Sequence, residues 1–140
     1  MQTRFSMPIT AVAADIDELG HVSNLVYLRW VLDTALAHSR SVGWDIPQYQ
    51  QLGAVFVVRR HEIDYIAPVT IGQTITAETW VSDWKSASCT RNTELLRDGK
   101  VVAKAATTWA LIALVSGRPQ RIPPNLRATF DPVAAASAAE

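Results

Sequence analysis

The sequence predicts a single α+β domain in which one long helix packs across an antiparallel five-stranded sheet. Residues 24–42 carry apolar side chains at helical spacing, and the other regular stretches alternate or are rich in β-branched residues, as strands do. The order is strand, long helix and then four strands joined mostly by short turns, so the later strands are expected to pair antiparallel. A chain of 140 residues suits one domain, which we expect over residues 1–130.

The first strand is expected over residues 4–12, where Pro8 suggests a sheet edge or a strand end. The helix that follows has clear boundary signals. Ser23 or Asn24 supplies an N-cap oxygen, and Gly43 stands where a left-handed residue commonly ends a helix. The polar connector after it is compatible with a short extra helical turn.

Apolar residues cover most of the circumference of this helix, so it must be enclosed by protein or lipid. With fewer than about 20 residues and with charged side chains such as Arg29 and Asp33, it is expected to be a core helix rather than a membrane span. Its apolar positions are Leu25, Leu28, Leu32, Ala35 and Leu36, widened by Val26, Tyr27, Trp30 and Val31.

The second strand, over residues 54–65, contains an irregularity. Strict alternation places Arg59 and His61 on the same face as four apolar residues. Either a β-bulge breaks the alternation, or this stretch borders a polar site or an interface. The four apolar residues are Val55, Val57, Ile63 and Tyr65.

Three further strands are expected over residues 73–84, 88–97 and 100–115. Asp98 and Gly99, between the last two, are a two-residue signal for a type I′ hairpin turn. Residues 122–124, Ile-Pro-Pro, are expected to begin an irregular tail. The alanine-rich residues 131–140 are expected to fray.

The composition excludes several classes of function. The formal net charge is zero, so no basic excess indicates a nucleic-acid partner. Cys89, the one cysteine, cannot form an intrachain disulfide and is expected to be buried filler. No signal peptide or metal-binding spacing is found, so a soluble cytoplasmic protein without a cofactor is expected. With five tryptophans, we expect some at a subunit contact or a pocket wall.

The segment between the first strand and the helix contains the dense polar motif Asp15-x-Asp17-x-x-Gly20-His21-Val22-x-Asn24-x-x-Tyr27. This motif resembles that of the hotdog-fold acyl-CoA thioesterases of the 4-hydroxybenzoyl-CoA thioesterase-like family, where it precedes and begins the central helix. The resemblance covers most of the chain. It implies a hotdog domain whose sheet wraps around one central helix, forming a homodimer or homotetramer that acts on acyl-CoA.

The resemblance also implies roles for three residues. Asp17 matches the catalytic carboxylate, which acts as a nucleophile on the thioester carbonyl or as a general base on water. Asn24 matches the residue whose backbone N–H polarises the thioester oxygen, and His21 matches a supporting histidine. Leu19 departs from the acyl-ACP thioesterases, which carry Asn there. Asp15 is expected to hydrogen-bond backbone within the segment.

Substrate contacts are expected from two aromatic residues and several cations. Tyr27 and Trp30 lie on the helix and are candidates for the pocket wall, or are simply core residues. Coenzyme A carries phosphates, so basic groups are needed at the pocket mouth. The candidate cations are expected at strand ends or turns, although an ordinary surface cation is the simpler interpretation of any one of them. They are Arg59, Arg60, Lys85 and Arg91.

Other functions hosted by the same fold are alternatives. A hydratase or dehydratase needs the motif Asp-x-Asn-x-x-His, which the chain does not contain. A non-catalytic acyl-CoA-binding protein would keep the pocket without needing Asp17. An acyl-ACP thioesterase is a further alternative, because the motif extends to that family.

Overall fold

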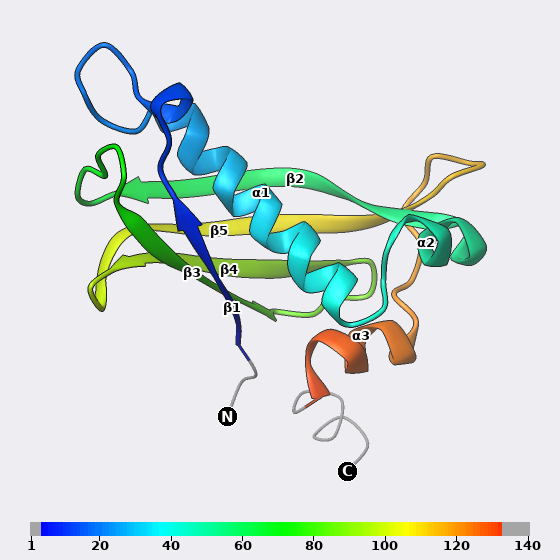
Figure 1. Ribbon diagram of the computed structural model, residues 1–140. Coiled ribbons are helices and arrows are strands. Elements are labelled where there is room, and N and C mark those ends of the chain that lie inside the picture. The colour runs from blue at the N-terminus through cyan, green and yellow to red at the C-terminus, as the bar shows by residue number, and fades with distance from the viewer. Residues whose placement is uncertain (1–3, 133–140) are drawn as a thin grey trace.

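The computed structural model describes residues 4–132, and it contains one antiparallel five-stranded sheet with a long helix across it (Figure 1). The strands are β1 (Phe5–Thr10), β2 (Ala54–Tyr65), β3 (Thr74–Ser82), β4 (Ser88–Arg97) and β5 (Lys100–Ala113). The helices are α1 (Asn24–Ser41), α2 (Ile46–Leu52), α3 (Pro124–Phe130) and a 3-10 turn, η1 (Ala13–Asp15). The predicted α+β architecture is confirmed, with short helices in addition to the long one.

The strand order β1-β3-β4-β5-β2 makes β1 and β2 the edge strands. Every neighbouring pair is antiparallel, as predicted. Pro8 is tolerated on β1 because an edge strand has backbone positions that need no partner. Asp98 and Gly99 both have positive φ, 52° and 78°, which a type I′ turn requires. The predicted hairpin between β4 and β5 is therefore confirmed.

Helix α1 begins and ends at the predicted signals. The Ser23 hydroxyl accepts a hydrogen bond from the Leu25 N–H at 3.3 Å, and Gly43 has a φ of 88° just after the helix. On the side away from the sheet, Leu25 and Leu36 are 76% and 51% exposed. One sheet covers only one side of a helix, so part of the apolar circumference is uncovered in a single copy of the chain. The buried residues of α1 are Val26, Tyr27, Trp30, Val31, Thr34, Ala35, His38 and Ser39.

A β-bulge at Arg59 explains the irregularity of β2. The pairing with β5 shifts between Val58 and Arg60, so Arg59 is the extra residue. The shift brings His61 opposite Thr107, and the His61 Nδ1 lies 2.9 Å from the Thr107 hydroxyl oxygen. The bulge also makes one predicted grouping wrong. The extra residue reverses the alternation of side chains after it, so Val55 and Val57 lie on the opposite face of the strand from Ile63 and Tyr65.

Residues 124–130 form α3, where the sequence suggested an irregular tail. Pro124 occupies the first position of the helix, where its missing N–H is not needed. Leu126 and Phe130 lie one turn apart and are both buried, which anchors the helix. Asp131 is buried as well, and its carboxylate accepts a hydrogen bond from the Trp84 indole at 3.0 Å. The predicted fraying of residues 133–140 concerns positions outside the described residues.

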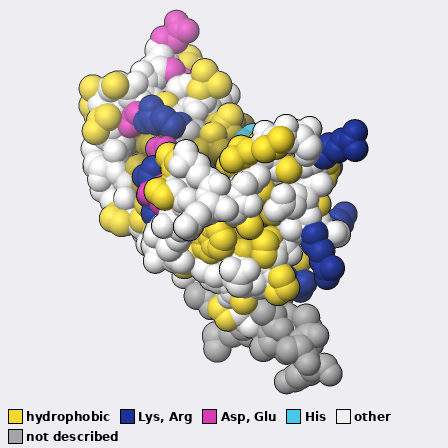
Figure 2. Space-filling model, turned by 90° about the vertical axis from the view of Figure 1, so that its right-hand side faces the viewer, with side chains coloured by type: hydrophobic (Ala, Val, Ile, Leu, Met, Phe, Trp, Pro, Cys, Tyr) yellow, Lys and Arg dark blue, Asp and Glu magenta, His cyan; other side chains and the backbone are white. Residues whose placement is uncertain are grey.

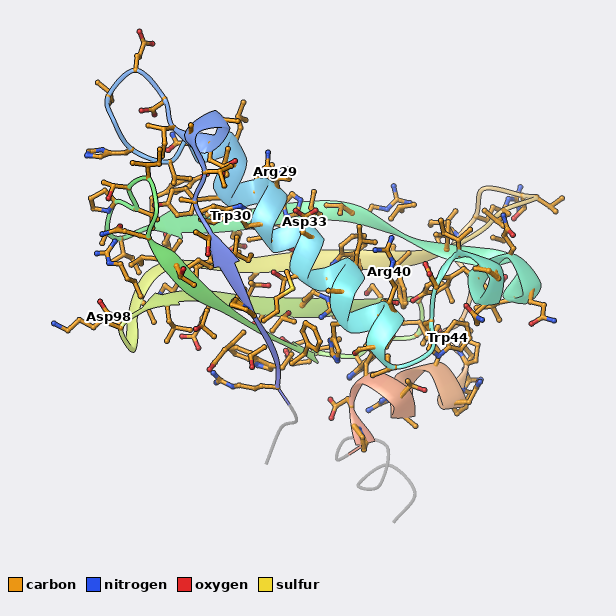
Figure 3. The ribbon with its side chains drawn as sticks, viewed as in Figure 1. Arg29, Trp30, Asp33, Arg40, Trp44 and Asp98 are labelled. Carbon is orange, nitrogen blue, oxygen red and sulfur yellow. The ribbon has the colours of Figure 1, made fainter. Side chains whose placement is uncertain are left out.

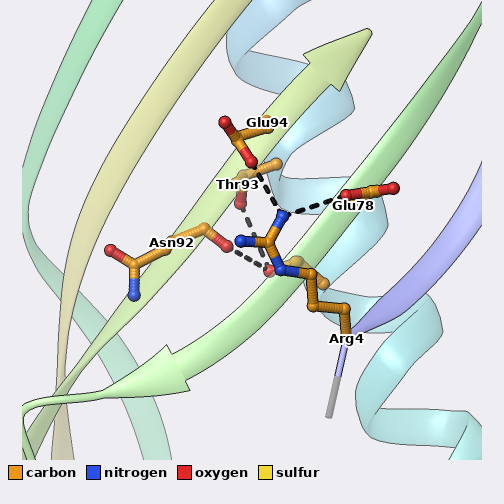
Figure 4. Close-up of polar contacts among 6 residues, drawn as sticks. Arg4, Glu78, Asn92, Thr93 and Glu94 are labelled. Carbon is orange, nitrogen blue, oxygen red and sulfur yellow. Dashed lines mark hydrogen bonds and ion pairs between the residues drawn. The ribbon is translucent and has the colours of Figure 1, made fainter. Parts of the chain in front are cut away.

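The face of the sheet away from α1 carries a cluster around Arg4 (Figure 4). The Arg4 guanidinium lies 3.1 Å from the Glu78 carboxylate and 2.9 Å from that of Glu94, and it stacks 3.7 Å above the centre of the Trp80 ring. These contacts join the start of the chain to β3 and β4. Exposed ion pairs contribute about 0.2–1 kcal/mol each, so the cluster adds little to the fold.

Candidate active site

The segment before α1 is tied to the helix by Asp15. The residue is 3% exposed, and its carboxylate accepts hydrogen bonds from the Val12 N–H at 3.0 Å and from the Arg29 guanidinium at 2.7 Å. The hydrogen bond from Val12, with help from Arg29, lowers the pKa of the Asp15 carboxyl. The Ser23 N–H also donates to the Asp15 carbonyl. Asp15 therefore bonds backbone, as predicted.

Asp17 lies in a tight turn immediately after this anchor. One carboxylate oxygen, Oδ1, accepts hydrogen bonds from the Leu19 N–H at 2.9 Å and the His21 N–H at 3.4 Å. Gly20 has a φ of 83°, which lets the chain reverse between these donors. The other oxygen, Oδ2, accepts no hydrogen bond from residues 4–132. The turn thus fixes the carboxylate and leaves one of its oxygens open.

Asn24 presents an open backbone donor at the start of α1. The Leu25 N–H is used by Ser23, but the Asn24 N–H donates to no acceptor within the described part of the chain. Free N–H groups at a helix N-terminus carry the positive end of the helix dipole, which favours a negative oxygen. Asn24 is exposed, so a substrate can reach this donor. The Tyr65 hydroxyl donates to the Asn24 carbonyl at 3.4 Å and joins the end of β2 to this site.

His21 belongs to the same turn. Its backbone carbonyl accepts from the Asp17 N–H at 2.8 Å, so backbone hydrogen bonds close the turn from both sides. The His21 side chain is exposed, and its ring makes no hydrogen bond to residues 4–132. The ring is therefore available to a substrate or a water.

The two aromatic candidates lie in the hydrophobic core. Tyr27 and Trp30 are both buried, their rings meet edge to face at 5.7 Å, and the Tyr27 hydroxyl donates to the Ala67 carbonyl at 3.1 Å. Both belong to the core cluster beneath the first half of α1. Their assignment as substrate contacts stays a prediction.

The four cations do not gather at one place. Lys85 is exposed in the connection between β3 and β4, as predicted. Arg59 and Arg60 are exposed at the bulge, in the middle of β2 rather than at a strand end, and Arg60 lies 2.6 Å from the Glu62 carboxylate. Arg91 is 6% exposed in the middle of β4. The expected location at strand ends is therefore wrong for these arginines.

A cavity of about 350 Å³ lies at the C-terminal end of α1. Hydrophobic side chains gather on the face of the molecule that carries α2 and α3 (Figure 2). Arg40 and Trp44 mark the cavity end of α1, whereas Arg29 and Trp30 mark the other end (Figure 3). Three of the five tryptophans line the cavity, so the expectation of a pocket wall is confirmed. Its aromatic wall consists of Trp44, Tyr49, Phe56, Trp84, Trp109 and Phe130.

Arg91 is the buried charge in this cavity. Its Nη1 donates to the His38 Nδ1 at 2.8 Å and to the Thr79 hydroxyl at 3.1 Å. Burial lowers the pKa of the guanidinium to about 10, and burial with the nearby Arg91 charge lowers the pKa of His38 to about 4. At neutral pH Arg91 is therefore charged and His38 is neutral. Burial also raises the pKa of the Cys89 thiol in the cavity wall to about 12, which excludes a thiolate nucleophile there.

Sequence reasoning missed the cavity and the histidine that contacts Arg91. A signal for Arg91 was present, because it shares the parity of Cys89, Thr93 and Leu95 on β4, all of which are buried. A cation on the buried parity of a strand is unusual and indicates a partner or a ligand. His38 carried a weaker signal, since it follows Trp30 and Thr34 at helical spacing on the buried side of α1.

The two polar sites lie at opposite ends of α1. A helix of 18 residues is about 27 Å long. The end of β2 contacts the start of α1 through Tyr65, while Val55 and Phe56 at the start of β2 line the cavity with Ala35 of α1. Helix α1 and strand β2 therefore run in opposite directions beside each other. Asp17 and the cavity are not brought together within one copy of the chain.

The described residues hold no cluster of His, Cys, Asp and Glu suited to a metal ion. None of the helices among residues 4–132 combines the length and hydrophobicity that a membrane crossing needs.

Comparisons with known proteins identify the family. Acyl-CoA thioesterase YbgC of Haemophilus influenzae is 27% identical over 129 residues, which cover 90% of this chain and 93% of YbgC. Slr0204, a 1,4-dihydroxy-2-naphthoyl-CoA thioesterase from Synechocystis, has a TM-score of 0.83 at 17% identity and covers 91% of this chain and 96% of its own. SAV2348 from Staphylococcus aureus, solved in complex with CoA, has a TM-score of 0.85 at 15% identity and covers 92% and 82%.

At these identities the two structures show the shared fold alone. The family model of the thioesterase-like superfamily matches residues 12–130, which include the motif, α1 and the whole of β2 to β5. The predicted hotdog-fold thioester hydrolase is confirmed at the level of the family. The chain belongs to the thioesterase-like superfamily.

Proposed function

We propose that this protein hydrolyses acyl-CoA thioesters to a free acid and coenzyme A. The proposal rests on the Asp17 carboxylate, which is fixed in the turn before α1 with one oxygen open, and on the open Asn24 N–H at the start of that helix. Membership of the superfamily and the likeness to the Haemophilus influenzae acyl-CoA thioesterase support the substrate class. A thiolate is a good leaving group, so the reaction needs a base or nucleophile and an oxyanion donor but no metal.

Asp17 supplies the base or the nucleophile. As a base, it takes a proton from the water that attacks the thioester carbon. As a nucleophile, its free Oδ2 attacks that carbon, the C–S bond breaks and the coenzyme A thiolate leaves, and water then hydrolyses the mixed anhydride to release the acid and restore Asp17. In both cases the Asn24 N–H stabilises the oxyanion, and the loss of one such donor typically costs about 3–4 kcal/mol of transition-state stabilisation. His21 is exposed beside Asp17, which suits it to hold the attacking water.

The working unit of the proposal is a homodimer joined through β2. This strand is an edge strand, and it leaves one side of its backbone unpaired within residues 4–132. A twofold axis across the middle of β2 pairs it antiparallel with the partner's β2. Because α1 and β2 run in opposite directions, this axis brings the Asp17 turn of one copy to the cavity of the other. A tetramer of two such dimers would cover further exposed apolar surface.

Arg59 and Arg60 lie at the centre of the proposed interface, where exposed cations can reach the phosphates of coenzyme A. Lys85 lies on a turn at the cavity end of the sheet and is the other exposed candidate. A charge-reversed variant of Lys85, which lies outside the proposed interface, is expected to raise KM for acyl-CoA with little change in kcat.

The test compares Asp17→Asn with Glu18→Gln, an exposed neighbour that is not assigned a role. Release of free thiol is measured with a panel of acyl-CoA esters, and unfolding and size are measured in parallel. We expect Asp17→Asn to reduce kcat at least a hundredfold with fold and dimer intact, and Glu18→Gln to remain active. If neither the parent nor the control releases thiol while both bind acyl-CoA tightly, the protein is a binder. Thiol release from acyl-ACP alone would identify an acyl-ACP thioesterase.

A further inference from the structure

The cavity at the end of α1 has an apolar wall and one buried cation. Its aromatic rings surround a volume near the lower end of the roughly 300–1,000 Å³ that small-molecule pockets occupy. The described charged side chains at its rim are Arg40 and Asp45, which lie 3.4 Å apart and neutralise each other. Asp45 also caps α2 through the Ile46 N–H. The interior charge therefore comes from Arg91.

Arg91 has no anionic partner among residues 4–132, where every ion pair involves other cations. The groups packed on its guanidinium are the neutral His38, the Thr79 hydroxyl and the face of Phe130 at 5.5 Å. His38 is itself held between Phe5, which stacks on it at 5.2 Å, and the edge of Phe130. A buried cation without a counter-ion is costly, so an anion from outside the chain is favoured at this place.

One edge of the guanidinium has no partner among the described residues. Nη1 is used by His38 and Thr79, whereas Nε and Nη2 donate to no described residue and keep some accessible surface, and Arg91 lines the cavity. The Nε–H and one Nη2–H point the same way from the planar group. This edge is the fork that binds both oxygens of a carboxylate.

We propose that the cavity binds a ligand with an apolar ring or chain that ends in a carboxylate, which pairs with Nε and Nη2 of Arg91. The aromatic wall encloses the apolar body, and the buried fork selects the charged end. Two sources share this chemistry. One is a free carboxylic acid; the other is an acyl-CoA whose acyl group carries a second carboxylate at its far end. The second source rests on the proposed hydrolase function, and the first does not.

The first arm uses binding alone. The unaltered protein is titrated with 3-phenylpropionate and with its neutral amide, and binding is followed by calorimetry and by fluorescence of the cavity tryptophans. The acid is expected to bind at least tenfold more tightly than the amide. Arg91→Met should remove this preference while it retains the affinity for the amide, and Arg91→Lys should restore part of it.

The second arm uses hydrolysis. Adipoyl-CoA and hexanoyl-CoA have the same chain length, but only the former carries a carboxylate at the far end. The unaltered protein is expected to favour adipoyl-CoA in kcat/KM, and Arg91→Met should shift the ratio at least tenfold towards hexanoyl-CoA. The contrast between the two ligands in the unaltered protein tests the proposal even if Arg91→Met does not fold.

The outcomes separate the two proposals. Equal binding of acid and amide, or an acid preference that survives in a folded Arg91→Met, overturns the carboxylate site. An Arg91-dependent acid preference without hydrolysis of any ester supports the site with a free acid as ligand, and it counts against the proposed hydrolase. Hydrolysis of both esters with no Arg91-dependent preference supports the hydrolase and excludes the acyl-CoA source of the carboxylate; if acid and amide also bind equally, the carboxylate site is overturned.

Discussion

The two ends of α1 are stabilised in different ways. At the start of the helix, Asp17 accepts hydrogen bonds from residues two and four positions further along the chain, and Asp15 reaches back three positions to Val12. At the other end, Arg91 contacts His38 across 53 positions of sequence. The walls of the cavity come from all three α-helices and from strands β2 to β5. The first site is local and exposed; the second is long-range and buried.

This difference fits two tasks of a hydrolase. Water must reach the attacking group, so an exposed turn that fixes its own carboxylate suits the chemistry. An acyl group is recognised by the removal of its surface from water, so a buried aromatic cavity suits selectivity. The separation of about 27 Å along α1 keeps these tasks apart in one copy. In the proposed dimer, each turn serves the partner's cavity.

Mixed dimers test most directly whether the turn of one copy serves the cavity of the other, and they have the largest expected effect. Asp17→Asn removes the turn's carboxylate, and Ala35→Phe fills the cavity from α1. Each homodimer is expected to lose at least a hundredfold in kcat. A heterodimer of the two variants keeps one intact turn facing one intact cavity, so about half of the parent activity should return.

Two affinity tags isolate the heterodimer, and thiol release measures its activity. A heterodimer of Asp17→Asn with the parent is the control and should also show about half activity. If turn and cavity of the same copy form the site, the mixed dimer stays inactive while this control stays active. That result would overturn the division between copies.

Asp15→Asn is expected to weaken the contacts at the start of α1 and to leave the cavity end unchanged. The change removes the ion pair between the buried Asp15 carboxylate and the half-exposed Arg29, and it disturbs the hydrogen bond from Val12, so it should lower the free energy of unfolding by about 1–3 kcal/mol. Asp33→Asn is the matched control, because Asp33 also faces Arg29, at 3.9 Å, but is half exposed. Its expected effect is below about 0.5 kcal/mol. Chemical denaturation measures both, and equal effects would show that burial of Asp15 contributes nothing.

Features that local signals determine were predicted well. Ser23, one of two predicted N-cap residues, Gly43 and the Asp98-Gly99 turn each act through backbone geometry within a few residues. The antiparallel pairing of β3, β4 and β5 also followed from short turns, and β1 lies at an edge as Pro8 suggested. The position of β2 beside β5 was not predicted. The motif identified the family before any contact was known.

The long-range end was not predictable in the same way. Two prolines made residues 122–124 resemble an irregular tail, so α3 was not predicted. Its anchors Leu126 and Phe130 stabilise the helix only when they are buried against the sheet and α1. The bulge at Arg59 was one of two open interpretations, because alternation alone does not say where a strand gains a residue. Arg91 was judged by its charge and expected at the surface, although its parity on β4 indicated burial.

The pH dependence of stability at His38 tests how the cavity end is held together. Its pKa is lowered from an ordinary 6.5 to about 4, so between these values the unfolded chain takes up a proton and the folded chain does not. The contribution of His38 to stability is therefore complete above about pH 6.5 and is lost as the pH falls towards 4. After allowance for screening, the loss should amount to about 2 kcal/mol.

Denaturant unfolding at pH 7.5 and pH 4.5 measures this loss. His38→Gln keeps a hydrogen-bond acceptor for Arg91 but does not titrate, so its stability should fall less between the two pH values than that of the parent. Burial also lowers the pKa of His61, and that share of the pH dependence remains in both proteins. If His38→Gln retains the parent's full pH dependence, His38 is not held neutral by its burial against Arg91, and the charge in the cavity is partnered in another way.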